Sequence, residues 1–172
     1  MLRCWRGTED FLDLEQWLTG CKVLHEKAKL GTLTGMEEQD YKARRGDIAR
    51  AMLAAQDLMR PPGQHRRQSL RVARAIQVEL ESRGRKERLT TFDISMGGFS
   101  APMASAPLPG ELLTATLQLP GMAPLVMQAR VVGSIAQTGF VRVSFAFGNL
   151  EGLAAEQLEF AIFDMVLGQF GA

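Results

Sequence analysis

The hydrophobic pattern changes once along the 172 residues of this chain, at the segment PPGQ (residues 61–64), and this change constrains the fold most strongly. Before it, apolar residues recur at three- and four-residue steps, as Ile48, Met52 and Ala55 do. After it, apolar and polar residues alternate. Prolines lack an amide donor and disfavour helical geometry in the residue before them, so the helical pattern ends here. The sequence therefore predicts a helical part and a β-rich part joined by a linker at 61–66.

Residues 1–60 are predicted to form an antiparallel α-helical hairpin. Gly31 interrupts the first helical pattern, and Thr34 with Glu37 makes a capping box at the start of the second. Two such helices do not bury both of their apolar faces against each other. We therefore expect the hairpin to dock on the rest of the chain, on a second copy in a homodimer through these helices, or on a protein partner.

Residues 67–172 are predicted to form an antiparallel sheet followed by a helix. Strands are expected where apolar and polar residues alternate, namely at 76–81, 91–96, 113–119, 125–131 and 141–147. Half-buried strands at this spacing typically close into a small barrel or a sandwich. The apolar and acidic residues of 150–169 predict a C-terminal helix that packs along or across one opening of the barrel. The predicted fold class is α+β.

Composition excludes some functions and favours a cytoplasmic location. The net charge is only +1, so no global field attracts nucleic acid or an anionic membrane, and any anion recognition must be local. Cys4 and Cys21 are too few for a secreted disulfide framework. We find no signal-peptide pattern and no apolar run near the ~18 residues that a membrane span requires, so membrane insertion is not expected.

Four arginines lie within nine positions just before the first strand, in RRQSLRVAR (the arginine segment, residues 66–74). Arg67 and Arg71 are four residues apart, which places both side chains on one side of an extended or a helical segment. A guanidinium group is a planar set of donors that pairs bidentately with phosphate or with the O6/N7 edge of guanine. The segment favours an anionic, purine-bearing ligand, although a solvated basic linker is the alternative.

A second polar cluster follows in DISMGG, at the end of the next predicted strand. Strand alternation places Asp93 and Ser95 together on the outer face. The Asp93 carboxylate could accept from guanine N1–H and N2–H, and the Ser95 hydroxyl could add a further contact. Gly97 and Gly98 remove side chains where a ligand or the next turn comes close. An ordinary outer strand face that ends in a glycine turn is the alternative.

Together the two segments resemble the PilZ domain, a bacterial receptor module for cyclic di-GMP. The RxxxR motif of that family matches RQSLR, from Arg67 to Arg71, and its [D/N]xSxxG motif matches Asp93, Ser95 and Gly98. The resemblance covers roughly residues 64–170 and fills every defining position of both motifs. It implies a six-stranded antiparallel barrel with a C-terminal helix.

The resemblance also implies a function and a site. The implied ligand-binding set is Arg66, Arg67, Arg71, Asp93, Ser95, Gly97 and Gly98. Arg67 and Arg71 would hold guanine Hoogsteen edges and phosphates, while Asp93 and Ser95 would read a guanine's Watson–Crick edge. In this family the arginine segment is mobile without ligand and wraps the dinucleotide on binding, which would move the attached helical hairpin. The expected protein is an effector that signals to a protein partner in motility, pilus or surface-behaviour control.

Enzyme chemistry, a cofactor and a metal are not predicted. His25 and His65 have no evident acid or nucleophile partner in the sequence, and Cys21 with His25 supplies only two of the ligands that a metal site needs. Besides the effector, a PilZ adaptor that acts only through protein contacts remains open. A nucleic-acid binder is a distant third, because no aromatic residues interleave with the basic ones.

Overall fold

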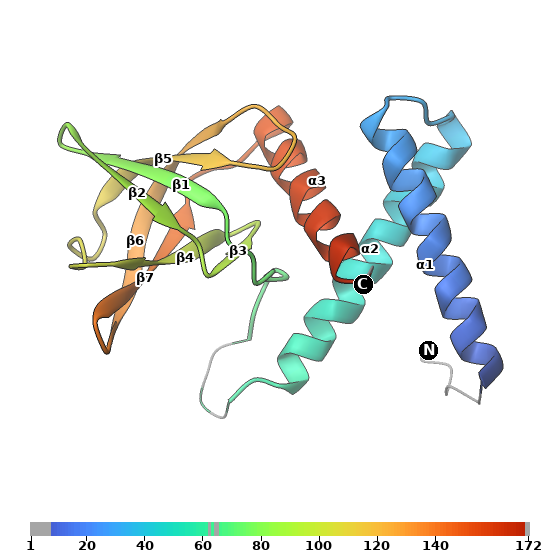
Figure 1. Cartoon of the computed structure of the whole chain (residues 1–172), viewed down its shortest axis with the longest axis horizontal. Coiled ribbons are helices and arrows are strands. Elements are labelled where there is room, and N and C mark those ends of the chain that lie inside the picture. Colours follow the sequence, from blue (N-terminus) through green and yellow to red (C-terminus); the bar gives the residue numbers. More distant parts are fainter. Residues whose placement is uncertain (1–7, 62, 64–65, 171–172) are drawn as a thin grey trace.

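The computed structural model describes residues 8–61, 63 and 66–170, with side chains from residue 13 onward. It has three helices and one curled antiparallel sheet, and the third helix lies between the sheet and the first two helices (Figure 1). Cys4 and His65 are outside the described residues. The predicted α+β class, with a barrel-like sheet, an N-terminal helical hairpin and a C-terminal helix, is confirmed.

The helical hairpin consists of α1 (Thr8–Lys29) and α2 (Gly35–Leu58). Gly31 ends the first helix with a φ of +64°. The predicted capping box is confirmed, because the Thr34 hydroxyl accepts from the Glu37 amide and the Glu37 carboxylate accepts from the Thr34 amide at 2.9 Å. Hydrogen bonds from Lys27 and from Thr34 lower the pKa of Glu37 to about 2. These contacts define where the two antiparallel helices turn.

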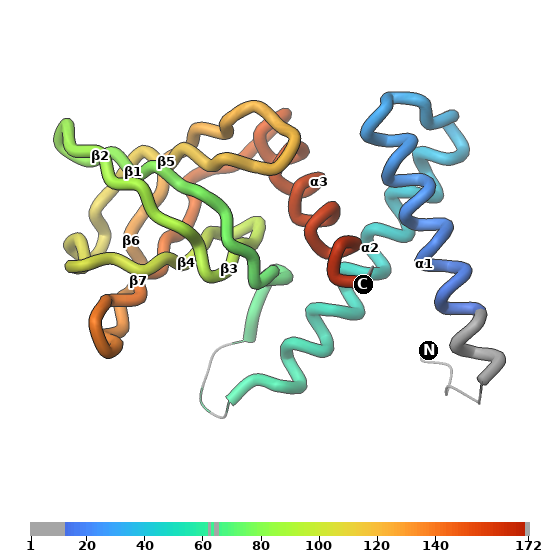
Figure 2. Tube along the Cα trace, in the orientation of Figure 1, coloured from blue at the N-terminus to red at the C-terminus, as the bar shows by residue number. Residues whose placement is uncertain are grey.

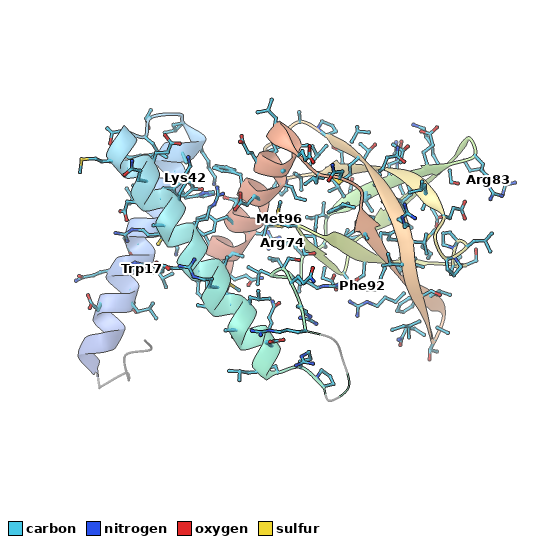
Figure 3. All side chains as sticks on the ribbon, turned by 180° about the vertical axis from the view of Figure 1, so that it is seen from behind. Trp17, Lys42, Arg74, Arg83, Phe92 and Met96 are labelled. Carbon is cyan, nitrogen blue, oxygen red and sulfur yellow. The ribbon has the colours of Figure 1, made fainter. Side chains whose placement is uncertain are left out.

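The sheet has seven strands in the order β2-β1-β5-β6-β7-β4-β3, and every neighbouring pair is antiparallel. Its strands are β1 (Gln77–Ser82), β2 (Arg85–Thr90), β3 (Asp93–Ser95), β4 (Gly98–Met103), β5 (Leu112–Gln118), β6 (Leu125–Gln137) and β7 (Phe140–Phe147). The curl of the sheet brings its two edge strands, β2 and β3, toward each other, as the chain trace shows (Figure 2). The β1–β2 turn, marked by Arg83, lies at the end of the sheet farthest from the helices (Figure 3).

The resemblance implied six strands and alternation marked five, so both counts were below the observed seven. Alternation marks only strands with one buried face. Strand β2 is exposed along almost its whole length at the edge of the sheet. Strand β4 is buried at five of its six positions, between β3 and β7. Thr91 divides β2 from β3, since its hydroxyl donates to the Arg74 carbonyl at 2.6 Å and accepts from the Ile76 amide at 3.0 Å.

Helix α3 (Gly152–Gln169) joins the sheet to the helical hairpin. One continuous apolar core runs from barrel residues such as Phe99 through Leu158 and Val166 of α3 to Ile48 of α2. An ion pair between Arg45 and Glu159 adds a polar tie between α2 and α3. The hairpin therefore docks on the chain's own C-terminal helix; its pairing with a second copy stays a prediction.

A buried histidine ties the three helices together. His25 is 2% exposed, and its two ring nitrogens lie 2.7 Å from the Tyr41 hydroxyl and 2.9 Å from a carboxylate oxygen of Asp164. Burial lowers the pKa of His25, against the opposite effect of Asp164. A neutral ring that donates to Asp164 and accepts from Tyr41 satisfies both contacts. The expectation that this histidine lacks an acid partner was wrong, because its partner is 139 residues away.

Two further observations concern the described residues alone. None of their helices combines the length and apolar character that a membrane crossing requires. Among these same residues, no three His, Cys, Asp or Glu side chains are grouped so that they could hold a metal ion.

Candidate ligand-binding site

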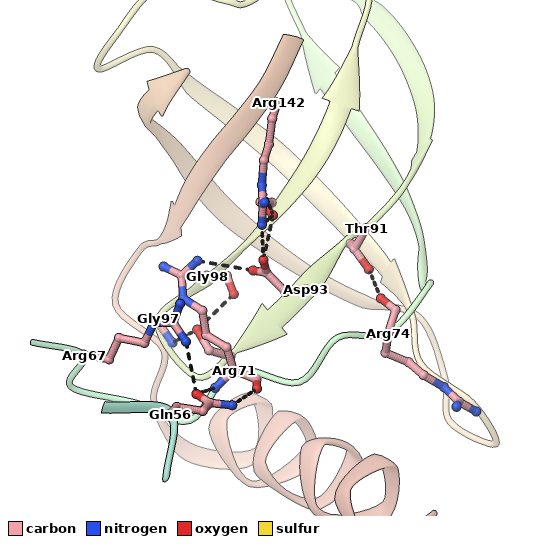
Figure 4. A network of polar contacts seen from close by, with 11 residues as sticks. Gln56, Arg67, Arg71, Arg74, Thr91, Asp93, Gly97, Gly98 and Arg142 are labelled. Atoms are coloured by element: carbon pink, nitrogen blue, oxygen red, sulfur yellow. Dashed lines mark hydrogen bonds and ion pairs between the residues drawn. The ribbon is translucent and has the colours of Figure 1, made fainter. Parts of the chain in front are cut away.

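The arginine segment leads into the barrel and is anchored beside β3. Leu70 and Val72 are buried, and Val72 pairs with Ile94 through backbone hydrogen bonds of 2.8 and 3.0 Å. Because Arg71 stands between these two anchors, its guanidinium is held next to Asp93 (Figure 4). Arg74, the last arginine of the segment, projects away from that contact (Figure 4).

The last turns of α2 hold the arginine segment. The carboxamide of Gln56 donates to the Arg71 carbonyl at 2.6 Å and accepts from the Arg71 amide at 3.2 Å. The same oxygen accepts from the Arg67 guanidinium at 3.4 Å. The neighbouring Asp57 pairs with Arg66 at 2.8 Å. All three predicted arginines therefore contact α2 in this structure. Sequence periodicity gave no signal for this role of Gln56.

Asp93, on β3, is the centre of the polar cluster (Figure 4). Its side chain is 15% exposed, and its Oδ1 atom accepts from Nη1 of Arg71 at 3.3 Å. The other oxygen, Oδ2, accepts from the Ser100 hydroxyl at 3.0 Å and from the Arg142 guanidinium. The structure therefore brings one arginine of the first motif into contact with the carboxylate of the second.

Arg142, on β7, was not among the predicted site residues. It stands opposite Pro102 of β4, and β4 in turn pairs Ser100 with Asp93. Its guanidinium carbon also lies 5.3 Å from the ring centre of Phe92, which is 39% exposed. Alternation along β7 shows that Arg142 faces away from the buried Val143, but only the strand register places it beside Asp93.

Ser95 is buried rather than on the outer face, so that expectation was wrong. It is 3% exposed, its hydroxyl donates to the Gly98 carbonyl at 3.1 Å, and it accepts from the Gly97 amide at 3.3 Å. The physical reason is the tight β3–β4 turn, whose backbone groups need a side-chain partner. A contact between Ser95 and a ligand stays a prediction.

The two glycines of the turn have different surroundings. A β-carbon on Gly98, whose φ is +150°, would lie 1.9 Å from the carbonyl oxygen of Phe145 on β7. One on Gly97 would meet only the hydroxyls of Ser69 and Ser95, at 3.6 and 3.9 Å. Gly98 is therefore required for the close approach of two strands, whereas Gly97 has room on the side of the arginine segment.

The cluster combines an excess of positive charge with exposed planar groups. Arg66, Arg71 and Arg142 pair with the carboxylates of Asp57 and Asp93, and Arg67 contacts the neutral Gln56. Beside them, a mostly apolar cavity of about 240 Å³ is lined by residues of the arginine segment, α2 and α3, and Met96 faces it from the barrel (Figure 3). The arrangement suits an anionic ligand with flat rings, and the cavity leaves the segment room to shift.

A family comparison agrees with this geometry. The model of the PilZ domain matches residues 65–164, which include both motifs, the whole sheet and most of α3. The chain belongs to the PilZ domain family. The match leaves α1 and α2 outside the PilZ domain, so Gln56 and Asp57 contact its arginine motif from a neighbouring element.

Solved structures share the PilZ fold at low identity. YcgR from Escherichia coli, in complex with cyclic di-GMP, is 18% identical with a TM-score of 0.56 over 62% of this chain and 48% of that one. MrkH from K. pneumonia, in its cyclic di-GMP complex, is 21% identical with a TM-score of 0.55 over 62% and 55%. The inhibitor of motility MotI from Bacillus subtilis is 18% identical with a TM-score of 0.53 over 62% and 56%.

These similarities establish the fold of the PilZ domain alone. The chain matches about half the length of each of the three structures. Comparison with curated proteins finds no match.

Proposed function

We propose that this chain is a receptor for cyclic di-GMP that changes conformation when the ligand binds. The observation that carries the proposal is the contact of Arg71 with Asp93, which brings the two PilZ motifs together at one partly exposed site. Arg67 and Arg66 lie on the same segment, and every defining motif position is filled. The cyclic di-GMP complexes of YcgR and MrkH, which share the fold, add support.

The ligand would exchange partners with groups that already pair with each other. Arg71 donates to Asp93 in this structure. A guanine has acceptors that can replace Asp93 as the partner of Arg71, and donors that can replace Arg71 as the partner of Asp93. Arg67 and Arg66 would add contacts to the two phosphates. Because few charges are involved, affinity should fall with salt, but less steeply than for a polynucleotide.

The contacts with α2 suggest how binding reaches the helical hairpin. Phosphates compete with Asp57 for Arg66 and with Gln56 for Arg67, so ligand binding would weaken the hold of α2 on the segment. The cavity beneath the segment provides space for this rearrangement. A local electrostatic change would then shift one arrangement of the hairpin to another, which a protein partner in motility, pilus or surface-behaviour control could read.

Isothermal titration of the full chain with cyclic di-GMP tests the proposal. We expect micromolar or tighter binding that is weakened at least about tenfold in Arg71→Ala and in Asp93→Ala, since each loses charged hydrogen bonds. Arg88→Ala is the matched control, because Arg88 is an exposed arginine of β2 outside the site. The stoichiometry from the same titration shows whether one ligand or a stacked pair binds. Absence of binding by the native chain at high micromolar ligand would refute the receptor and favour the adaptor.

A further inference from the structure

The two oxygens of the Asp93 carboxylate are held by different parts of the molecule. Among the described residues, Oδ1 contacts Arg71 alone, from the arginine segment, at 3.3 Å, and the Arg71 side chain is 42% exposed. Oδ2 accepts from Ser100 on β4 and from Arg142 on β7. One oxygen therefore faces a segment outside the sheet, and the other faces the sheet itself (Figure 4).

The contacts of Oδ2 form a closed network within three adjacent strands. Arg142 donates through Nε and Nη2 to the Ser100 oxygen at 3.2 and 3.0 Å, and the Ser100 hydroxyl donates to Oδ2 of Asp93 at 3.0 Å. Ser100 is fully buried and stands opposite Asp93 in the β3–β4 register. Because the paired strands hold all three side chains, this network keeps its geometry when the arginine segment moves.

Charge balance at Asp93 makes Arg142 important once a ligand arrives. If Arg71 turns from Asp93 to an anionic ligand, the carboxylate loses one cation and gains negatively charged phosphates nearby. At 15% exposure, water screens that repulsion only in part. Among the described residues, Arg142 is the other guanidinium paired with this carboxylate. It would keep the Asp93 carboxylate paired with a cation and fixed in orientation.

We propose that Arg142 is a positioning residue for guanine recognition, which holds Oδ2 of Asp93 and leaves Oδ1 as the oxygen that accepts from the ligand. The proposal rests on the proposed function, since it assigns a role within that site. Arg142 acts here through Asp93 rather than through a phosphate. Its effect on binding should therefore depend on the carboxylate and leave the salt dependence of binding unchanged.

A double-mutant cycle measured by titration with cyclic di-GMP tests this role. Arg142→Gln should weaken binding about tenfold or more in the native background. In the Asp93→Asn background, where no charge needs balancing, the same change should weaken binding less than about twofold. The slope of affinity against salt should stay native in Arg142→Gln and become shallower in Arg71→Ala, which removes a proposed phosphate contact.

Folding and the proposed function are controlled separately. Arg142→Lys keeps the charge but cannot bridge Oδ2 and Ser100 as a planar group does, so it should weaken binding about threefold or more, again only when Asp93 is present. If Arg142→Gln fails to fold, Arg142→Lys replaces it in the double-mutant cycle with Asp93→Asn. Equal losses in both backgrounds, or near-native binding by both variants, would overturn the role of Arg142 alone. Absence of binding by the native chain would overturn the receptor and this role together.

Discussion

Replacing Gly98 by alanine should destabilise the whole PilZ domain, because the strands β4 and β7 meet at this glycine. The new β-carbon would lie 1.9 Å from the Phe145 carbonyl oxygen, 3.0 Å from the Phe145 carbonyl carbon and 3.0 Å from the α-carbon of Ala146. Relieving the first overlap requires the two backbones to separate by roughly 1 Å, since real β-carbons essentially never approach within 3.0 Å. The φ of +150° adds strain to any L-residue.

The expected cost follows from these two effects. A backbone held in a disallowed region costs about 1–3 kcal/mol, and each weakened ladder hydrogen bond costs about 1 kcal/mol. The bond from the Phe147 amide to the Gly97 carbonyl, now 3.0 Å, is one of those at risk. Together they predict a loss of about 2–4 kcal/mol, a large part of a typical unfolding free energy of about 5–15 kcal/mol.

Chemical denaturation followed by circular dichroism measures this loss. Gly97→Ala is the matched control, since its β-carbon meets only two hydroxyls at 3.6 and 3.9 Å, and its stability should stay within about 0.5 kcal/mol of native. If the free energy of unfolding of Gly98→Ala lay within about 1 kcal/mol of the native value, the strand contact would not be the reason for this glycine. Its motif position would then have to be explained by room for the ligand.

Three further changes test other parts of the structure. Gln56→Ala removes the three hydrogen bonds that Gln56 makes to the arginine segment, so titration should show cyclic di-GMP binding about three- to tenfold tighter. The control Gln128→Ala should bind with native affinity. Unchanged or weaker binding by Gln56→Ala would mean that the segment stays on α2. Burial lowers the pKa of His25 below its usual 6.5. Below pH 6.5 the unfolded chain therefore binds more protons at this residue than the folded chain does. The free energy of unfolding should fall as the pH drops through this range. Denaturation of His25→Gln should show a flatter pH profile, and an equally steep one would assign the effect elsewhere. Thr34→Ala removes the capping hydroxyl and should lower stability by about 1 kcal/mol in the same assay, whereas an unchanged midpoint would show that the cap is redundant.

Local patterns in the sequence were sufficient for the elements and for the two motifs. The change of period at residues 61–64 separated helices from strands, and Thr34 with Glu37 marked a helix start through contacts three residues apart. The alternation that marks strands failed at β2 and β4, where the residues are nearly all exposed or nearly all buried. Patterns of this kind depend on neighbours in the chain, which is why they can be read without the fold.

The partners of those residues were decided by the tertiary structure. Gln56 holds Arg71, Arg142 holds Asp93, and Asp164 holds His25, at separations of 15, 49 and 139 residues. Alternation shows which face of a strand a residue occupies, but not which residue stands opposite it, because register depends on how the strands pair. The sequence by itself therefore determined which chemical groups the two motifs of this PilZ domain carry. The folded sheet and the docked helices decided which of them are paired, buried or free to exchange, since those properties arise only when distant segments pack together.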